Sequence, residues 1–305
     1  MTTSSLTPRS STPRSARPRR SISGLLYIAP FFVLFGFFLA WPTVYGLYLS
    51  FTDRNLAGSA AAQLVGFANY VEAFGDSLMW RTLGNTLLFT VGSTIPLVIV
   101  ALALALLVNL KLKGQWLWRL SFFMPYLLAS TVVSLIWIWL FNPDLGAVNA
   151  VLGAVGIQGP AWLQDPQTAM AAVIIATVWW TVGFNFLLYI SGMQNIPEQV
   201  YEAASVDGAS GWRQLFSITL PLLGRTTALV VALQVLASIK VFDQIYQMTS
   251  GGPADSTRTI LEYVYDAGFS NYRLGYASAI SYIFFLVVII LSLVQLRIFS
   301  RKAGR

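Results

Sequence analysis

PEQVYEAASVDGASGWRQLFSITLP, residues 197–221, is a polar stretch that hydrophobic segments enclose on both sides. Pro197 suits the first turn of a helix, and Glu198 follows where a negative charge is favourable beside the helix dipole. Gly208 is suited to end this helix, and Ser210 can cap a second one. The stretch therefore predicts an L-shaped pair of short helices at a membrane surface, held by the spans before and after it.

The second helix of the pair would present Trp212, Leu215 and Phe216 on one face. Leu220-Pro221 would close this helix ahead of the next span. An ordinary loop that tucks an amphipathic turn against the lipid is the alternative interpretation of the same composition.

The spacing within the stretch resembles the EAA loop found in the membrane subunits of bacterial ABC importers. The motif reads Glu202-Ala203-Ala204, then Gly208, then Ile218-x-Leu220-Pro221. In that family the loop docks into a cleft on a cytoplasmic ATPase and couples ATP binding to movement of the spans. The resemblance implies that the ATPase-coupling residues are Glu202, Ala203, Ala204, Asp207, Gly208 and Phe216.

Composition places the chain among membrane proteins. Its 305 residues are 56% hydrophobic and 10% charged, whereas a soluble domain carries about 25% charged residues. There is no Cys and no His, which excludes thiol chemistry and Ser–His pairs. No Gly-x-x-x-x-Gly-Lys loop is present to hold ATP phosphates, and the acids are too scattered for a metal site. We expect a subunit that is not itself an enzyme and binds no cofactor or nucleic acid.

Hydropathy predicts an all-α membrane protein with six spans, each close to the roughly 20 residues that a bilayer requires. We place them at 24–51, 84–110, 118–141, 168–192, 226–247 and 275–298. Residues 1–23 are rich in Ser, Thr, Pro and Arg and predict a disordered basic tail. A signal peptide is the alternative, but the apolar run that follows is too long and lacks a cleavage pattern. Residues 301–305 form a second basic tail.

The basic residues predict the orientation. Most of the 19 Lys and Arg residues lie in the two tails, in 111–119 and around the polar stretch. The positive-inside rule therefore places both termini and the polar stretch in the cytoplasm, where an ATPase would dock.

Several outer segments strengthen the family resemblance, which covers roughly residues 24–300. They are Gly66-Phe67-Ala68-Asn69-Tyr70, Asn85-Thr86, Phe123-Met124-Pro125, Phe141-Asn142-Pro143-Asp144, Thr249-Ser250-Gly251-Gly252-Pro253 and Gly275-x-Ala277-Ser278-Ala279. They resemble the first-type permease of two-permease sugar importers, the group with the maltose and glycerol-3-phosphate systems. The resemblance implies the type I permease fold in a bacterial inner membrane, a second homologous permease, two ATPase domains that use ATP and Mg²⁺, and an extracytoplasmic solute-binding protein.

The spans on either side of the polar stretch carry candidate solute-path residues. Thr177, Thr181 and Asn185 recur every four residues and share one helix face. The other candidates are Trp180, Phe184, Gln234 and Ser238. Hydroxyls and amides can bond a sugar while aromatic rings cover its C–H face, but the same residues can hydrogen-bond neighbouring helices instead. Both interpretations remain open.

Lys240 and Asp243 lie three residues apart near the outer end of the fifth span and can pair, either as a structural contact or as part of an outer gate. Three other functions compete with the importer. An ion-coupled secondary transporter usually carries more intramembrane acids or His than this chain has. A non-transporting scaffold would leave the polar faces unexplained, and an importer of amino acids or peptides would share the same coupling stretch.

Overall fold

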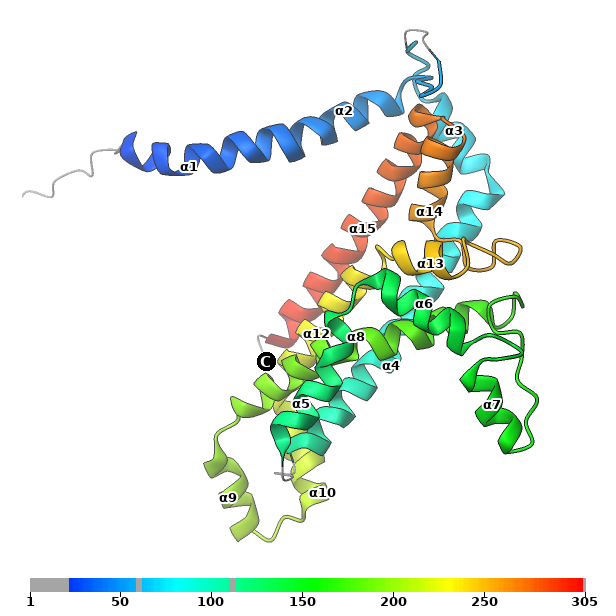
Figure 1. Cartoon of the computed structure of the whole chain (residues 1–305). Coiled ribbons are helices and arrows are strands. Elements are labelled where there is room, and N and C mark those ends of the chain that lie inside the picture. The colour runs from blue at the N-terminus through cyan, green and yellow to red at the C-terminus, as the bar shows by residue number, and fades with distance from the viewer. Residues whose placement is uncertain (1–21, 59–61, 110–113, 304–305) are drawn as a thin grey trace, which may run out of the picture. The chain divides into compact units, whose positions relative to one another are not determined.

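The computed structural model describes residues 22–58, 62–109 and 114–303 (Figure 1). These residues are almost entirely helical, and their one extended pairing is an antiparallel bridge between Thr52 and Leu64. The predicted all-α fold is thus confirmed. The predicted tail 1–23 falls almost wholly outside the described residues, and helix begins at Ile22, whereas in the predicted tail 301–305 the last helix continues to Ala303. The chain forms two compact units, residues 1–46 and 47–305.

The first unit is a single helical rod. It contains α1 (Ile22–Phe35), the π-helix η1 (Gly36–Ala40) and the start of α2 (Trp41–Ser50), which follow one another directly. Tyr27–Ser50 is long and apolar enough to cross a membrane, which agrees with the predicted span 24–51.

The second unit holds the remaining helices. They are α3 (Ala68–Gly75), α4 (Ser77–Asn109), α5 (Gln115–Phe123), the 3-10 helix η2 (Met124–Leu127), α6 (Ser130–Leu140), α7 (Ala147–Ala154), α8 (Ala169–Gln194), α9 (Glu198–Val206), α10 (Gly211–Gln214), the π-helix η3 (Leu215–Thr219), α11 (Leu220–Leu222), α12 (Gly224–Ser238), α13 (Asp243–Met248), α14 (Ile260–Tyr265), the π-helix η4 (Asp266–Ser270) and α15 (Leu274–Ala303). Figure 1 shows α9 and α10 together at one end of this unit, with α3 and α14 at the other.

Three further helices in the described residues could each cross a bilayer: Ser77–Asn109, Ala169–Gln194 and Leu274–Ile298. Two bent pairs also have suitable composition, Gln115–Leu127 with Ser130–Leu140 at 98° and Gly211–Leu222 with Gly224–Ser238 at 58°. The six predicted spans are recovered when each bent pair crosses once.

The predicted span 118–141 is sharply bent and is not one continuous helix. Pro125 lies in η2, and beyond it Leu128 adopts an extended backbone with φ −74° and ψ 145°. Pro lacks the N–H that a helix interior needs, so α5 ends before it and α6 starts in a new direction. The helix α8 also packs very closely against the backbone just before this break. Only Gly fits at position 183, because a Cβ atom added there would lie 2.3 Å from the Phe122 carbonyl oxygen.

The predicted span 226–247 is also not one helix, since α12 ends at Ser238 and a turn separates it from α13. Nor does Pro221 close the preceding helix. It lies in the first turn of α11, where its missing N–H costs little. The helical path instead bends at Leu223 and continues into α12.

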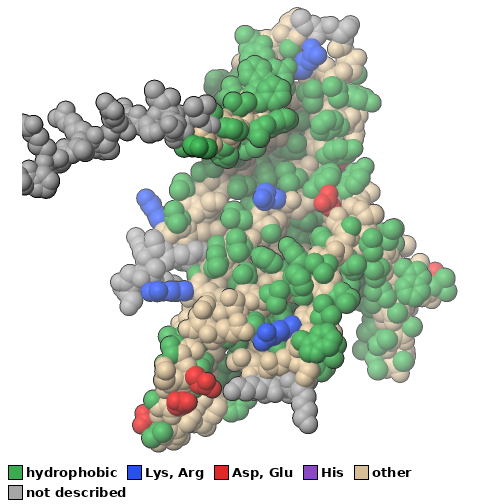
Figure 2. Space-filling view, turned by 60° about the vertical axis from the view of Figure 1, so that its left-hand side comes forward, with side chains coloured by type: hydrophobic (Ala, Val, Ile, Leu, Met, Phe, Trp, Pro, Cys, Tyr) green, Lys and Arg blue, Asp and Glu red, His purple; other side chains and the backbone are tan. Residues whose placement is uncertain are grey.

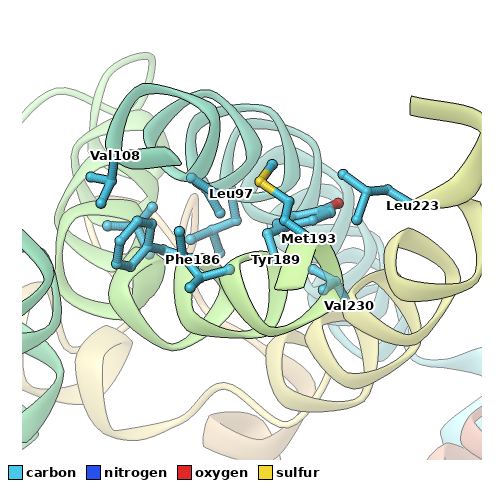
Figure 3. Packing of buried hydrophobic residues seen from close by; sticks show 11 residues of the cluster. Leu97, Val108, Phe186, Tyr189, Met193, Leu223 and Val230 are labelled. Carbon is cyan, nitrogen blue, oxygen red and sulfur yellow. The ribbon is translucent and has the colours of Figure 1, made fainter. Parts of the chain in front are cut away.

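The core of the second unit lies between α4, α8 and α12 (Figure 3). Ala101 and Ala105 of α4 are fully buried, and their small side chains allow close approach of α8. Phe186 and Tyr189 of α8 fill the space beside them, and Val230 of α12 completes the cluster. This packing fixes α8 and α12, the two helices that flank the polar stretch.

Candidate functional site

The polar stretch folds into a helix pair with well-defined ends. Pro197 precedes the first helical residue of α9 with φ −60° and ψ 134°, as a residue at this boundary should. At the other end Gly208 has φ +75°. Its N–H donates to the carbonyl of Ser205 at 3.1 Å, and the N–H of Ala209 donates to the carbonyl of Ala204 at 2.9 Å. These two bonds form a Schellman motif, so the predicted helix end at Gly208 is confirmed.

Hydrogen bonds fix the angle between the two helices of the pair. The Ser210 side chain caps α10 by accepting from the N–H of Arg213 at 3.4 Å. The Gln214 amide donates to the Ser205 hydroxyl at 3.0 Å and to the Ala209 carbonyl at 3.1 Å. These bonds hold α9 against α10. Residues 197–221, which also contain η3, are called the coupling loop here, after the family resemblance.

Within the coupling loop, α9 is also bonded to η3, the π-helix through which the chain continues into α11 and α12. The hydroxyl of Tyr201 in α9 lies 3.0 Å from the hydroxyl of Thr219 in η3, within hydrogen-bond distance. A force on α9 therefore reaches η3 directly, in addition to passing along the backbone.

Large apolar side chains are exposed on this otherwise polar loop. Val206 is 89% exposed, Trp212 71% and Phe216 62%, and the rings of Trp212 and Phe216 stack with centroids 6.1 Å apart. Glu202, Ala203, Asp207 and Gly208 are exposed as well, while Ala204 is half-buried. An exposed apolar surface on a rigid and partly acidic loop is typical of a docking site for another protein.

The buried polar residues of the flanking spans form one network. The amide nitrogen of Asn185 in α8 donates to the Gln234 side-chain oxygen in α12 at 2.9 Å. The Gln234 amide nitrogen donates to the Ser238 hydroxyl at 2.8 Å, and that hydroxyl lies 2.9 Å from the Ser93 hydroxyl in α4. The network joins three helices, so each predicted path residue in it has a protein partner. The side-chain oxygen of Asn185 alone is buried without one.

The remaining path candidates on α8 have different surroundings. The buried Thr177 hydroxyl lies 3.0 Å from the Gln244 side-chain oxygen, and the Thr181 hydroxyl donates to the Thr177 carbonyl at 2.7 Å. The Trp180 indole donates to the Leu128 carbonyl at 3.1 Å. This bond satisfies a backbone oxygen that the break between η2 and α6 would otherwise leave free.

Phe184, by contrast, is exposed. Its ring stacks on that of Tyr126 at 5.3 Å. Among the path candidates, Phe184 is thus the side chain with the most surface available for a solute.

Lys240 and Asp243 are both exposed, and they lie in the turn after α12 and at the start of α13. The ion pairs within the described residues are formed by Arg258 and Arg273, so the predicted Lys240–Asp243 pair is not formed in this conformation.

The segment between α13 and α14 forms polar contacts with α4 that single out further residues. The Asn85 amide donates to the carbonyls of Asp255 at 2.8 Å and Arg258 at 3.0 Å, and the Thr86 hydroxyl accepts from the N–H of Ile260 at 2.9 Å. Sequence analysis had noted Asn85-Thr86 only as part of a resemblance.

The same analysis missed Ser93. The signal for it was the spacing of hydroxyl residues along α4, where Thr82, Thr86 and Thr90 recur every four residues ahead of Ser93 and all are buried.

Several helices long and apolar enough to cross a membrane, with an exposed helix pair at one end, indicate a membrane protein that can contact a partner through this pair. Comparison with known proteins agrees. The family model described as "Binding-protein-dependent transport system inner membrane component" matches residues 85–305, and the chain belongs to this family. It is therefore a permease subunit of the inner membrane, as the sequence predicted, and ATP hydrolysis belongs to a separate subunit.

Similar proteins extend over nearly the whole chain. The sulfoquinovosyl glycerol transport system permease protein SmoG of Agrobacterium fabrum is 36% identical over 278 residues, which cover 91% of this chain and 90% of that protein. The sn-glycerol-3-phosphate transport system permease protein UgpA of the same organism is 35% identical, covering 91% and 94%. The lactose transport system permease protein LacF of Rhizobium radiobacter is 33% identical, covering 90% and 93%.

A solved structure shows the same fold. A chain of a bacterial ABC transporter involved in the import of the acidic polysaccharide alginate superimposes with a TM-score of 0.79 at 24% identity, covering 92% of this chain and 96% of that one.

Proposed function

We propose that the chain forms half of the translocation pore of an ATP-driven importer for a sugar or sugar-like solute. The coupling loop carries this proposal, because hydrogen bonds hold its helices together, it exposes an apolar surface, and its first helix α9 is bonded to η3 through Tyr201 and Thr219. Its partners would be a second, homologous permease, two ATPase domains that use ATP and Mg²⁺, and an extracytoplasmic solute-binding protein.

The mechanism follows from the connections of the loop. Closure of the ATPase domains would move the surface around Glu202 and Gly208. Because α10, η3, α11 and α12 follow one another along the chain, this displacement reaches the polar network at Gln234 and Ser238. Exchange between two packings of that network would open the pore alternately to either side.

The chemistry of the path favours a hydroxylated solute. Phe184 and Trp180 offer aromatic rings, Thr181 a hydroxyl, and Asn185 an unpaired carbonyl oxygen. Relatives named for lactose, glycerol 3-phosphate and sulfoquinovosyl glycerol transport support the same class of solute. An importer of amino acids or peptides is the alternative within the family.

The test is uptake by the complete complex. The chain is purified with the second permease and ATPase of its own system and reconstituted in vesicles with the binding protein. Labelled lactose, sn-glycerol 3-phosphate and sulfoquinovosyl glycerol are then offered in turn. We expect ATP-dependent accumulation of one of them that survives collapse of the proton and sodium gradients. Accumulation by the chain alone on an ion gradient would instead support secondary transport, and accumulation of amino acids only would move the solute out of the sugar class.

A further inference from the structure

An aromatic cluster lies at the end of the molecule away from the coupling loop and has no part in the network described above. It consists of Phe242, Tyr246, Tyr265 and Phe269, from the turn before α13, α13, α14 and η4. The rings of Phe242 and Tyr246 stack with centroids 5.4 Å apart, and Tyr265 lies 5.6 Å and 5.5 Å from them. Phe269 continues the row at 5.5 Å from Tyr265.

The cluster occupies the face of α13 that points away from the protein. Ile245 and Met248, on the opposite face, are buried against the cluster of α6 and α8 side chains. Tyr246 is 41% exposed and Phe269 56% exposed. The cluster is therefore an open aromatic surface and not part of the core.

Two exposed charged residues adjoin the cluster in the chain. Lys240 and Asp243 flank Phe242, at the turn after α12 and the start of α13. A charged side chain in the hydrocarbon region is costly, so such residues face a water-filled path or a partner. The exposed face of α15 is different, because Phe285, Leu286 and Ile290 lie in a stretch, 274–296, that contains no charged residue. Figure 2 shows broad hydrophobic areas on one face of the molecule, interrupted by charged side chains at a few places.

We propose that Phe242, Tyr246, Tyr265 and Phe269 form an outer subsite that receives one sugar ring of the solute before it reaches the spans. The exposed rings of Tyr246 and Phe269 suit the apolar C–H face of a pyranose, and Lys240 and Asp243, which flank Phe242 in the chain, offer charged groups for its hydroxyls. This inference rests on the proposed function, since it names a second contact for the same class of solute.

The test uses the absence of Cys from the chain, so that within this chain a maleimide can react only with an introduced Cys. The wild-type complex serves as the control for label on the other subunits. The variants Tyr246→Cys, Asp144→Cys and Ile290→Cys are produced in the complete complex, in right-side-out vesicles with the binding protein, and exposed to a membrane-impermeant maleimide. We expect label at positions 246 and 144 and none at 290. The saccharide that the wild-type complex transports should slow labelling at 246 several-fold and leave 144, on an exposed outer loop, unchanged.

Transport by substituted complexes gives an independent measurement. Tyr246→Leu and Phe269→Leu should raise the half-saturation concentration for that saccharide roughly five- to tenfold, the effect expected when one aromatic contact is lost. Tyr246→Phe keeps the ring and should behave as wild type, which separates lost stacking from misfolding.

Two results overturn the inference while leaving the proposed function intact: no label at 246, or label there without protection together with wild-type transport by Tyr246→Leu. Failure of the wild-type complex to transport any saccharide would instead count against the proposed function.

Discussion

Gly208 should control the coupling loop through its backbone conformation alone. Its φ of +75° lies in the left-handed region, and a Cβ atom added there would meet nothing within 4 Å. A substitution therefore introduces no clash with neighbours. It only disfavours the conformation that the Schellman bonds at Ser205 and Ala204 require.

The magnitude follows from the conformational cost. A residue with a Cβ atom pays about 1–2 kcal/mol in the left-handed region, which lowers the population of the native loop relative to alternatives about 5–30-fold. A β-branched side chain costs more, whereas Asn tolerates this region best among non-glycine residues. We therefore expect ATPase docking to weaken in the order Gly208→Asn, Gly208→Ala, Gly208→Val.

The assay is co-purification of the ATPase with each variant, followed by the ratio of solute transported to ATP hydrolysed. Gly211→Ala is the matched control, because Gly211 also has open space around it but no positive φ. Gly208→Val should lose docking or coupling while the control keeps both. If Gly208→Val and Gly211→Ala behave alike, the helix end at Gly208 is not what positions the docking surface.

Three further changes test the spans and the outer loops. Gln234→Leu removes the hydrogen bonds to Asn185 and Ser238, so the free energy of unfolding of the complex should fall by about 1–3 kcal/mol while the solute preference stays unchanged. If the complex assembles normally and its solute preference changes, Gln234 contacts the solute instead. Trp180→Phe keeps a ring but leaves the Leu128 carbonyl without its donor, and should destabilise the complex by about 1 kcal/mol in a thermal-shift measurement while Trp179→Phe does not. Burial raises the pKa of the Glu262 carboxyl to about 7 from 4.5, with Arg258 opposing and Asp266 adding to the rise. The folded state therefore favours the protonated carboxyl, and its contribution to stability is complete below pH 4.5 and lost as the pH rises through about 7. The chain has no His to titrate in this range, so Glu262→Gln should flatten the fall of the melting temperature between pH 5 and pH 8, and an unchanged slope would contradict a buried carboxyl with this pKa.

The parts of the fold that sequence predicts well are those decided locally. Gly208 and Ser210 end and cap helices through bonds to residues within five positions, and the long apolar helices follow from composition. The family resemblance rested on such local motifs, and the comparisons confirm it.

Sequence analysis does not predict the break after Pro125, because the residues on both sides of it are apolar and compatible with one continuous helix. What stabilises the break comes from α8, where Gly183 allows close contact and Trp180 satisfies the Leu128 carbonyl. Such partners lie more than 50 residues away, so no local pattern reveals them.

The same limit applies to the path residues. The sequence shows that Gln234 and Ser238 share a helix face. That Ser93 is the hydrogen-bond partner of Ser238 becomes visible only when α4 and α12 are packed together. Whether each of these polar side chains bonds the solute or another helix therefore depends on how the helices pack, which can differ between states of the transport cycle.

The π-helix η3 gives the coupling loop a turn that holds one residue in excess. A π turn contains one residue more than an α turn, so a single-residue deletion can be absorbed by converting the turn from π to α. The flanking helices then keep nearly the same rotational phase, because about five residues at the π pitch turn the chain about as far as about four residues at about 100° each. Deleting Ser217 should therefore leave the stacked pair of Trp212 and Phe216 facing nearly its present direction, whereas the loss of a second residue would turn the pair by about 100° about the helix axis. The stretch between Gln214 and Leu220 thus has a reserve of one residue in its length, and the direction of the docking surface depends on not exceeding it.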